Sequence, residues 1–130
     1  MKSGIKEILL NSPIEKVNEA SQTSNTDEDS ESKKALLKLN TLKGVTYLQE
    51  KNSGLIRYAK EYIKLARYDL AVLFAAETTY IQDKNALLIH IANATLTSGD
   101  FDTAQKAIES ITYVQDKNKL GLQLLKCMQS

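Results

Sequence analysis

The segment TYIQDKN, from Thr79 to Asn85, decides the fold because near-identical segments flank it at equal distances. The preceding segment, Thr46 to Asn52, reads TYLQEKN, and the following one, Thr112 to Asn118, reads TYVQDKN. The segments start at residues 46, 79 and 112, a spacing of 33. They differ only where one aliphatic residue replaces another and one carboxylate replaces another. A fixed period of this length predicts a chain of repeated helical units.

The residues between these heptapeptides carry apolar side chains at helical spacing. One such stripe, on a single helix face, consists of Ala104, Ala107, Ile108 and Ile111. Gly99 is suited to a left-handed helix end, and the following Asp100 is suited to cap the next helix. The heptapeptide marks the second break in each unit, where Asp83 or Asp116 can accept from the exposed N–H groups of the following turn.

We therefore expect two helices in each unit, joined by short connections and antiparallel to each other. A pair this small does not bury its own apolar stripe, so it depends on stacking against the next pair. The expected helices span residues 33–49, 52–65, 68–82, 85–98, 101–115 and 118–129.

The repeat resembles the tetratricopeptide repeat, a family of helix pairs with a period of 34 residues. In residues 85–117 the family's packing and turn positions are matched by Leu88, Ile91, Ala92, Gly99, Asp100, Phe101, Ala104 and Ile108. In the preceding unit they are matched by Leu55, Tyr58, Ala59, Tyr62, Tyr68 and Ala71. This chain departs from the family in its shorter period and in Asp83 and Asp116, which stand where the family usually has Pro.

The resemblance implies an all-α fold, a right-handed α-α superhelix of about six helices over residues 33–130, with a groove lined by the first helix of each pair. The residues expected to point into that groove are Ile56, Arg57, Lys60, Lys64, Ile89, His90, Asn93 and Thr97. Such a groove suits an extended or helical peptide. The carboxylate clamp of some family members is not matched, because Lys60 stands where the clamp has Asn and Ile89 where it has Lys. Alternatively, Lys60 and Lys64 belong to a solvated helix face.

Two segments precede the repeat domain of residues 33–130. Residues 21–32 read SQTSNTDEDSES, contain no apolar side chain and predict a disordered acidic linker. Residues 1–20 form a short amphipathic segment, in which Ser12 to Glu15 is a capping-box arrangement with Pro at the first helical position. A frayed tail and a docking segment both fit it.

The composition narrows the classes of function. The 17 basic and 16 acidic residues give a formal net charge of +1, so no positive field indicates a nucleic acid or a membrane as partner. A single cysteine and a single histidine do not make an intramolecular disulfide or a Cys/His metal site, and we expect neither metal nor cofactor. No apolar stretch has the length of a transmembrane helix or a signal-peptide core, so we expect a cytoplasmic protein.

Some of these residues have both a structural and a functional interpretation. We interpret His90 as a partly buried, hydrogen-bonded structural residue rather than a catalytic one, and Cys127 as inert core. We interpret the heptapeptide tyrosines, Tyr47, Tyr80 and Tyr113, as packing against the adjacent unit while the polar residues close the turn. The alternative is a ridge that presents the same groups three times to a partner.

Catalysis is not expected, because the sequence shows no nucleophile with its base, no phosphate-binding glycine loop and no paired carboxylates. By analogy with small tetratricopeptide proteins, we expect an adaptor or chaperone-like module that binds another protein or a peptide. Two alternatives remain. One is a self-associating structural protein, a homo-oligomer, because no polar capping helix is evident after Met128. The other is a regulatory domain that inhibits a larger machine.

Overall fold

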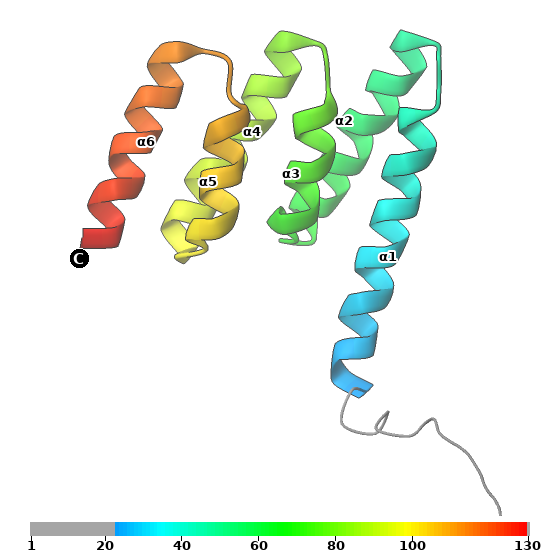
Figure 1. The fold of residues 1–130 in the computed structure, drawn as a ribbon, viewed down its shortest axis with the longest axis horizontal. Coiled ribbons are helices and arrows are strands. Elements are labelled where there is room, and N and C mark those ends of the chain that lie inside the picture. The colour runs from blue at the N-terminus through cyan, green and yellow to red at the C-terminus, as the bar shows by residue number, and fades with distance from the viewer. Residues whose placement is uncertain (1–22, 130) are drawn as a thin grey trace, which may run out of the picture. The chain divides into compact units, whose positions relative to one another are not determined.

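The computed structural model describes residues 23–129, and these residues form six α-helices (Figure 1). The helices are α1 Thr23–Lys43, α2 Leu48–Lys64, α3 Tyr68–Glu77, α4 Ile81–Ser98, α5 Phe101–Ser110 and α6 Val114–Gln129. The predicted all-α fold of about six helices is confirmed for this part of the chain. The chain divides into two compact units, residues 1–36 and 37–130. Helices α2 to α6 and the last turns of α1 belong to the second unit.

Helix α1 begins earlier than predicted. It starts at Thr23, whereas we expected residues 21–32 to be a disordered linker and the first helix to start at residue 33. Adding a residue to an existing helix is far easier than nucleating one, so a helix stable over 33–43 extends through residues that would not start one. The predicted amphipathic segment of residues 1–20 and the disordered tail lie outside the described residues.

The breaks at the heptapeptides fall earlier than predicted. Thr78 and Tyr80, which flank the α3–α4 break, are extended, with ψ of 135° and 106°, and α4 starts at the third residue of its heptapeptide. β-Branched and aromatic side chains favour this extended backbone. The prediction that Asp83 and Asp116 cap the helices is therefore wrong. Both lie in the first helical turn, where a carboxylate interacts favourably with the helix dipole.

The break inside the second complete unit is as predicted. Gly99 ends α4 in the left-handed conformation with φ of 85°, and the Asp100 side chain accepts a hydrogen bond from the Thr103 backbone N–H at 3.2 Å. The equivalent of Gly99 in the preceding unit is Ala66, which has φ of 58°. An alanine there carries a conformational cost that a glycine avoids.

The helices pack in the order of the chain. Helices α2 and α3 form one antiparallel hairpin and α4 and α5 the next (Figure 1), and each helix from α2 onward contacts the next one or two helices along the chain. Phe74 of α3 is fully buried, with its ring 5.5 Å from that of Tyr58 and 5.6 Å from that of Tyr62, both on α2. The core is therefore continuous from one hairpin to the next.

Candidate functional site

The best-preserved residue of the heptapeptide after its Thr-Tyr pair, the final Asn, links each unit to the next. Asn85 of α4 is fully buried and donates to the Ile81 carbonyl oxygen at 2.9 Å and to Thr112 Oγ1 at 2.8 Å. Its Oδ1 accepts from the Thr112 backbone N–H at 2.8 Å. A side chain in its own first turn thus holds the first residue of the next heptapeptide.

The same link occurs one unit earlier. Asn52 of α2 is fully buried, donates to Thr79 Oγ1 at 2.9 Å and to the Leu48 carbonyl oxygen at 3.1 Å, and accepts from the Thr79 backbone N–H at 2.8 Å. We call each of these arrangements an Asn–Thr link. Sequence reasoning missed the role of this residue, although an Asn recurring three residues before a buried Leu, on the apolar stripe, predicts a buried polar contact.

The heptapeptide tyrosines are more exposed than predicted. Tyr47, Tyr80 and Tyr113 are 73%, 39% and 40% exposed, so the interpretation that they pack against the adjacent unit is wrong for Tyr47 and holds only in part for the other two. The three turns that carry them lie at the same end of the helices (Figure 1). Each unit therefore shows an exposed tyrosine at this edge, while the Asn–Thr links are buried behind it.

The eight predicted groove residues lie on α2 and α4, and most of them are exposed. Ile56 and Ile89 are half-buried, and the six others are exposed: Arg57, Lys60, Lys64, His90, Asn93 and Thr97. The expectation that His90 is partly buried is wrong. It lies near the middle of α4, one position before buried Ile91, on the opposite side of the helix from the packed stripe.

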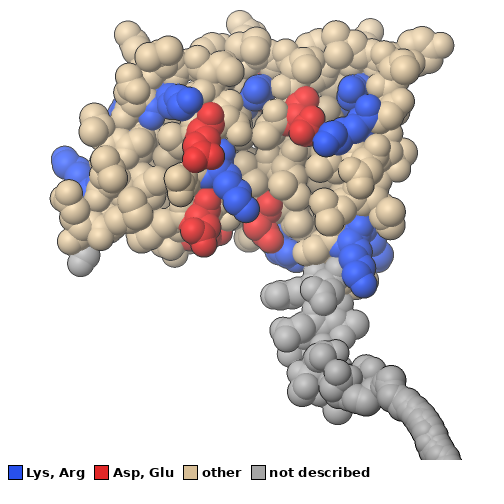
Figure 2. All heavy atoms as spheres, in the orientation of Figure 1, with Lys and Arg blue, Asp and Glu red and all other residues tan. Residues whose placement is uncertain are grey.

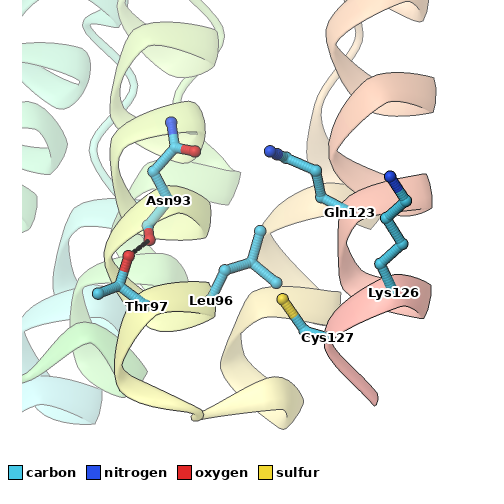
Figure 3. Close-up of a pocket in the computed structure, with 6 residues that line it drawn as sticks. All are labelled: Asn93, Leu96, Thr97, Gln123, Lys126 and Cys127. Carbon is cyan, nitrogen blue, oxygen red and sulfur yellow. Dashed lines mark hydrogen bonds between the residues drawn. The ribbon is translucent and has the colours of Figure 1, made fainter. Parts of the chain in front are cut away.

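Two of the predicted residues line a hollow between α4 and α6. This hollow has a volume of about 320 Å³ and is lined by Asn93, Leu96, Thr97, Gln123, Lys126 and Cys127 (Figure 3). The side-chain amides of Asn93 and Gln123 reach into it from opposite walls, and Leu96 and the Cys127 sulfur point toward each other below them (Figure 3). Thr97 Oγ1 donates to the Asn93 backbone carbonyl oxygen at 3.0 Å.

The α6 side of this hollow is missing from the sequence prediction. Gln123 and Lys126 stand 33 residues after His90 and Asn93, so the repeat period alone places them on the same face of the next first helix. Cys127, interpreted as inert core, is half-buried and forms part of the wall. The predicted surface thus extends across three helices rather than two.

Arg57 belongs to a different part of the surface. It lines two hollows beside the last turns of α1, of about 450 Å³ and 320 Å³, which share Leu42 and Gly54 as lining residues. Its guanidinium carbon lies 5.2 Å from the centre of the Tyr58 ring, a cation–π distance. The structure therefore places Arg57 with α1, and Asn93 and Thr97 with α6.

Charges of both signs are interspersed on the face that carries α3 and α5 (Figure 2). One ion pair there is bidentate: Arg67 Nε and Nη2 donate to the two carboxylate oxygens of Asp69, both at 3.1 Å. Burial raises the pKa of Asp69, but the hydrogen bonds and charge of Arg67 outweigh it, so the pKa lies below its usual 3.8. This pair ties the α2–α3 turn to the start of α3.

Two findings concern the described residues as a set. In residues 23–129 no three side chains among His, Cys, Asp and Glu come together as metal ligands. None of the helices in the same range has the length and apolar character needed to cross a membrane.

Comparisons with family models, with curated proteins and with solved structures give no match to this chain. The likeness to the tetratricopeptide repeat is therefore one of sequence pattern, and the function is argued from the surfaces described above.

Proposed function

We propose that this chain is a tetratricopeptide-like interaction module, without enzymatic activity, that binds an extended segment of another protein in the hollow between α4 and α6. The observation that carries the proposal is the pair of carboxamides facing each other across that hollow (Figure 3). The nearest-neighbour packing of α2 to α6 supports a superhelical stack of units. The single cysteine is in line with work in the cytoplasm.

The chemistry of the walls suits a peptide backbone. A carboxamide offers two N–H donors and one carbonyl acceptor, the complement of the N–H and C=O groups of an extended chain. Asn93 on α4 and Gln123 on α6 supply one carboxamide on each wall. Paired amides of this kind recognise the backbone itself and therefore accept segments of varied sequence.

The remaining lining residues add a preference for certain side chains. Leu96 and Cys127 make an apolar floor for one aliphatic side chain, and Lys126 at the rim attracts a carboxylate. We therefore expect a segment that carries an apolar residue next to an acidic one. The volume of about 320 Å³ is at the lower end of ligand sites, which fits one or two peptide residues rather than a whole helix.

The test is selection of binders from a random peptide library by the 130-residue chain, followed by fluorescence anisotropy of the enriched peptides. We expect acidic-apolar peptides, and a loss of affinity of about tenfold for Asn93→Ala or Gln123→Ala, the value of one good hydrogen bond to the backbone. Gln105→Ala is the matched control, because Gln105 is an exposed amide on α5. Equal binding by the double variant Asn93→Ala/Gln123→Ala and by this control would refute the site.

A further inference from the structure

The stacking face of the first helices is buried in two copies and exposed in the third. In α2 and α4, four positions on this face have at most 2% exposure: Asn52, Leu55, Ala59 and Tyr62, and Asn85, Leu88, Ala92 and Thr95. The equivalent positions of α6 are Asn118, Gly121, Leu125 and Met128. Of these, Leu125 is 54% and Met128 51% exposed, and Asn118 is exposed as well.

The cover that buries this face in α2 and α4 is the second helix of the same hairpin. Helix α3 covers α2 and α5 covers α4, and Phe74 of α3 meets the Tyr58 and Tyr62 rings of α2 directly. Helix α6 is a first helix, and the described residues contain no second helix after it. Its outer side is hollowed over about 440 Å³ between Leu122, Leu125 and the side chains around them.

The last turns of α1 show the complementary deficit. Helix α1 is a second helix, and the described residues contain no first helix before it. Leu37 is 67% exposed, although its equivalents Leu70 and Thr103 are 4% and 5% exposed. Thr41, the equivalent of Phe74, is exposed too. Helix α5 also lacks a following hairpin and still buries Thr103, so the missing cover belongs to the preceding first helix.

The Asn–Thr link is likewise divided between the two ends. Within residues 23–129, the Asn118 side chain and the Thr46 backbone N–H make no hydrogen bond, although both are heptapeptide residues whose equivalents are linked. An Asn for Thr46 would stand at position 19, which is Glu19. One end therefore holds an Asn without its Thr, and the other a Thr without its Asn.

We propose that this surface binds a second copy of the chain head to tail, so that α6 of one copy and α1 of the next form a composite hairpin. Asn118 then holds Thr46 of the second copy, as Asn52 holds Thr79 and Asn85 holds Thr112 within one chain. Leu125 and Met128 are covered by the α1 face that carries Leu37 and Thr41. Because the two surfaces differ, the contact is heterologous and each added copy offers the same end again.

Two variants separate this arrangement from a symmetric dimer. Leu125→Asp blocks the α6 end and Leu37→Asp blocks the α1 end, and both sites are exposed, so the monomer fold is retained, as circular dichroism will check. By sedimentation equilibrium we expect the unaltered chain to grow in mass with concentration beyond the dimer. Each variant alone is expected to stay monomeric, and an equimolar mixture to form a one-to-one dimer, since one intact end remains on each variant.

Matched controls sharpen this test. Val114→Asp places the same charge on α6 at a position that is exposed in all three first helices, as are Leu48 and Ile81, so assembly is expected to be unchanged. Asn118→Ala is expected to weaken assembly by about tenfold or more, because two hydrogen bonds to Thr46 are lost. A concentration-independent monomer, or a Leu37→Asp variant that still self-associates, overturns the proposal. The peptide hollow uses Asn93 and Gln123 instead, so either proposal can fail alone.

Discussion

Replacing Asn85 by Ala tests the energetic role of the Asn–Thr link. The fully buried side chain makes three hydrogen bonds, two to Thr112 and one to the Ile81 carbonyl oxygen, at 2.8 to 2.9 Å. At roughly 1 kcal/mol of net stability for each hydrogen bond, the loss is about 3 kcal/mol. The Thr112 N–H lies near the surface and regains water, which argues against a larger value.

Asn118→Ala is the control, because the same residue type occupies the same repeat position without a partner in the described chain. We expect it to change the free energy of unfolding by less than about 0.5 kcal/mol. The assay is urea denaturation followed by circular dichroism, at protein concentrations low enough to keep both variants monomeric. Equal urea midpoints for the two variants would show that the link contributes nothing and that the heptapeptide is preserved for another reason.

Two further predictions concern the turns between helices. Ala66→Gly should stabilise the protein by about 0.5–1 kcal/mol and Gly99→Ala should destabilise it by about 1 kcal/mol, because both positions are left-handed and Gly99 has no atom near enough to clash; thermal melting measures both, and shifts of the same sign contradict the explanation. Since the pKa of Asp69 is lowered by Arg67, its carboxylate contributes stability above pH 3.8, which is lost as the pH falls through the folded-state pKa. Asp69→Asn should therefore be less stable than the unaltered chain near neutral pH, with a difference that vanishes in acid; a pH-independent difference refutes the role of the charge.

The period of 33 residues was enough to predict the number of helices and the turn at Gly99 and Asp100, because both follow from local backbone preferences. It was not enough to place the starts of α2, α4 and α6. The extended backbone at Thr78 and Tyr80 depends on the packing of Thr78, which is 1% exposed, and on the Asn52 link to Thr79. These are contacts between residues 27 apart, which a local pattern does not contain.

The candidate surface was only partly predictable. Helical spacing placed Asn93 and Thr97 on one face of α4, and the structure puts that face against a hollow. The contribution of Gln123 and Lys126 follows from the period but was not drawn, since α6 was treated as a flanking half unit. The exposure of His90 depends on which side of α4 the hairpin covers, and that is decided by tertiary packing rather than by the sequence near His90.

The central claim is that the final Asn of each heptapeptide holds the first Thr of the next one. Backbone amide hydrogen exchange by NMR, on the dilute monomeric protein, measures this directly. We expect the Thr79 and Thr112 amides, which donate to Asn52 and Asn85, to be protected, and the Thr46 amide to exchange at the rate of an open chain. Equal exchange at all three threonines would contradict the claim.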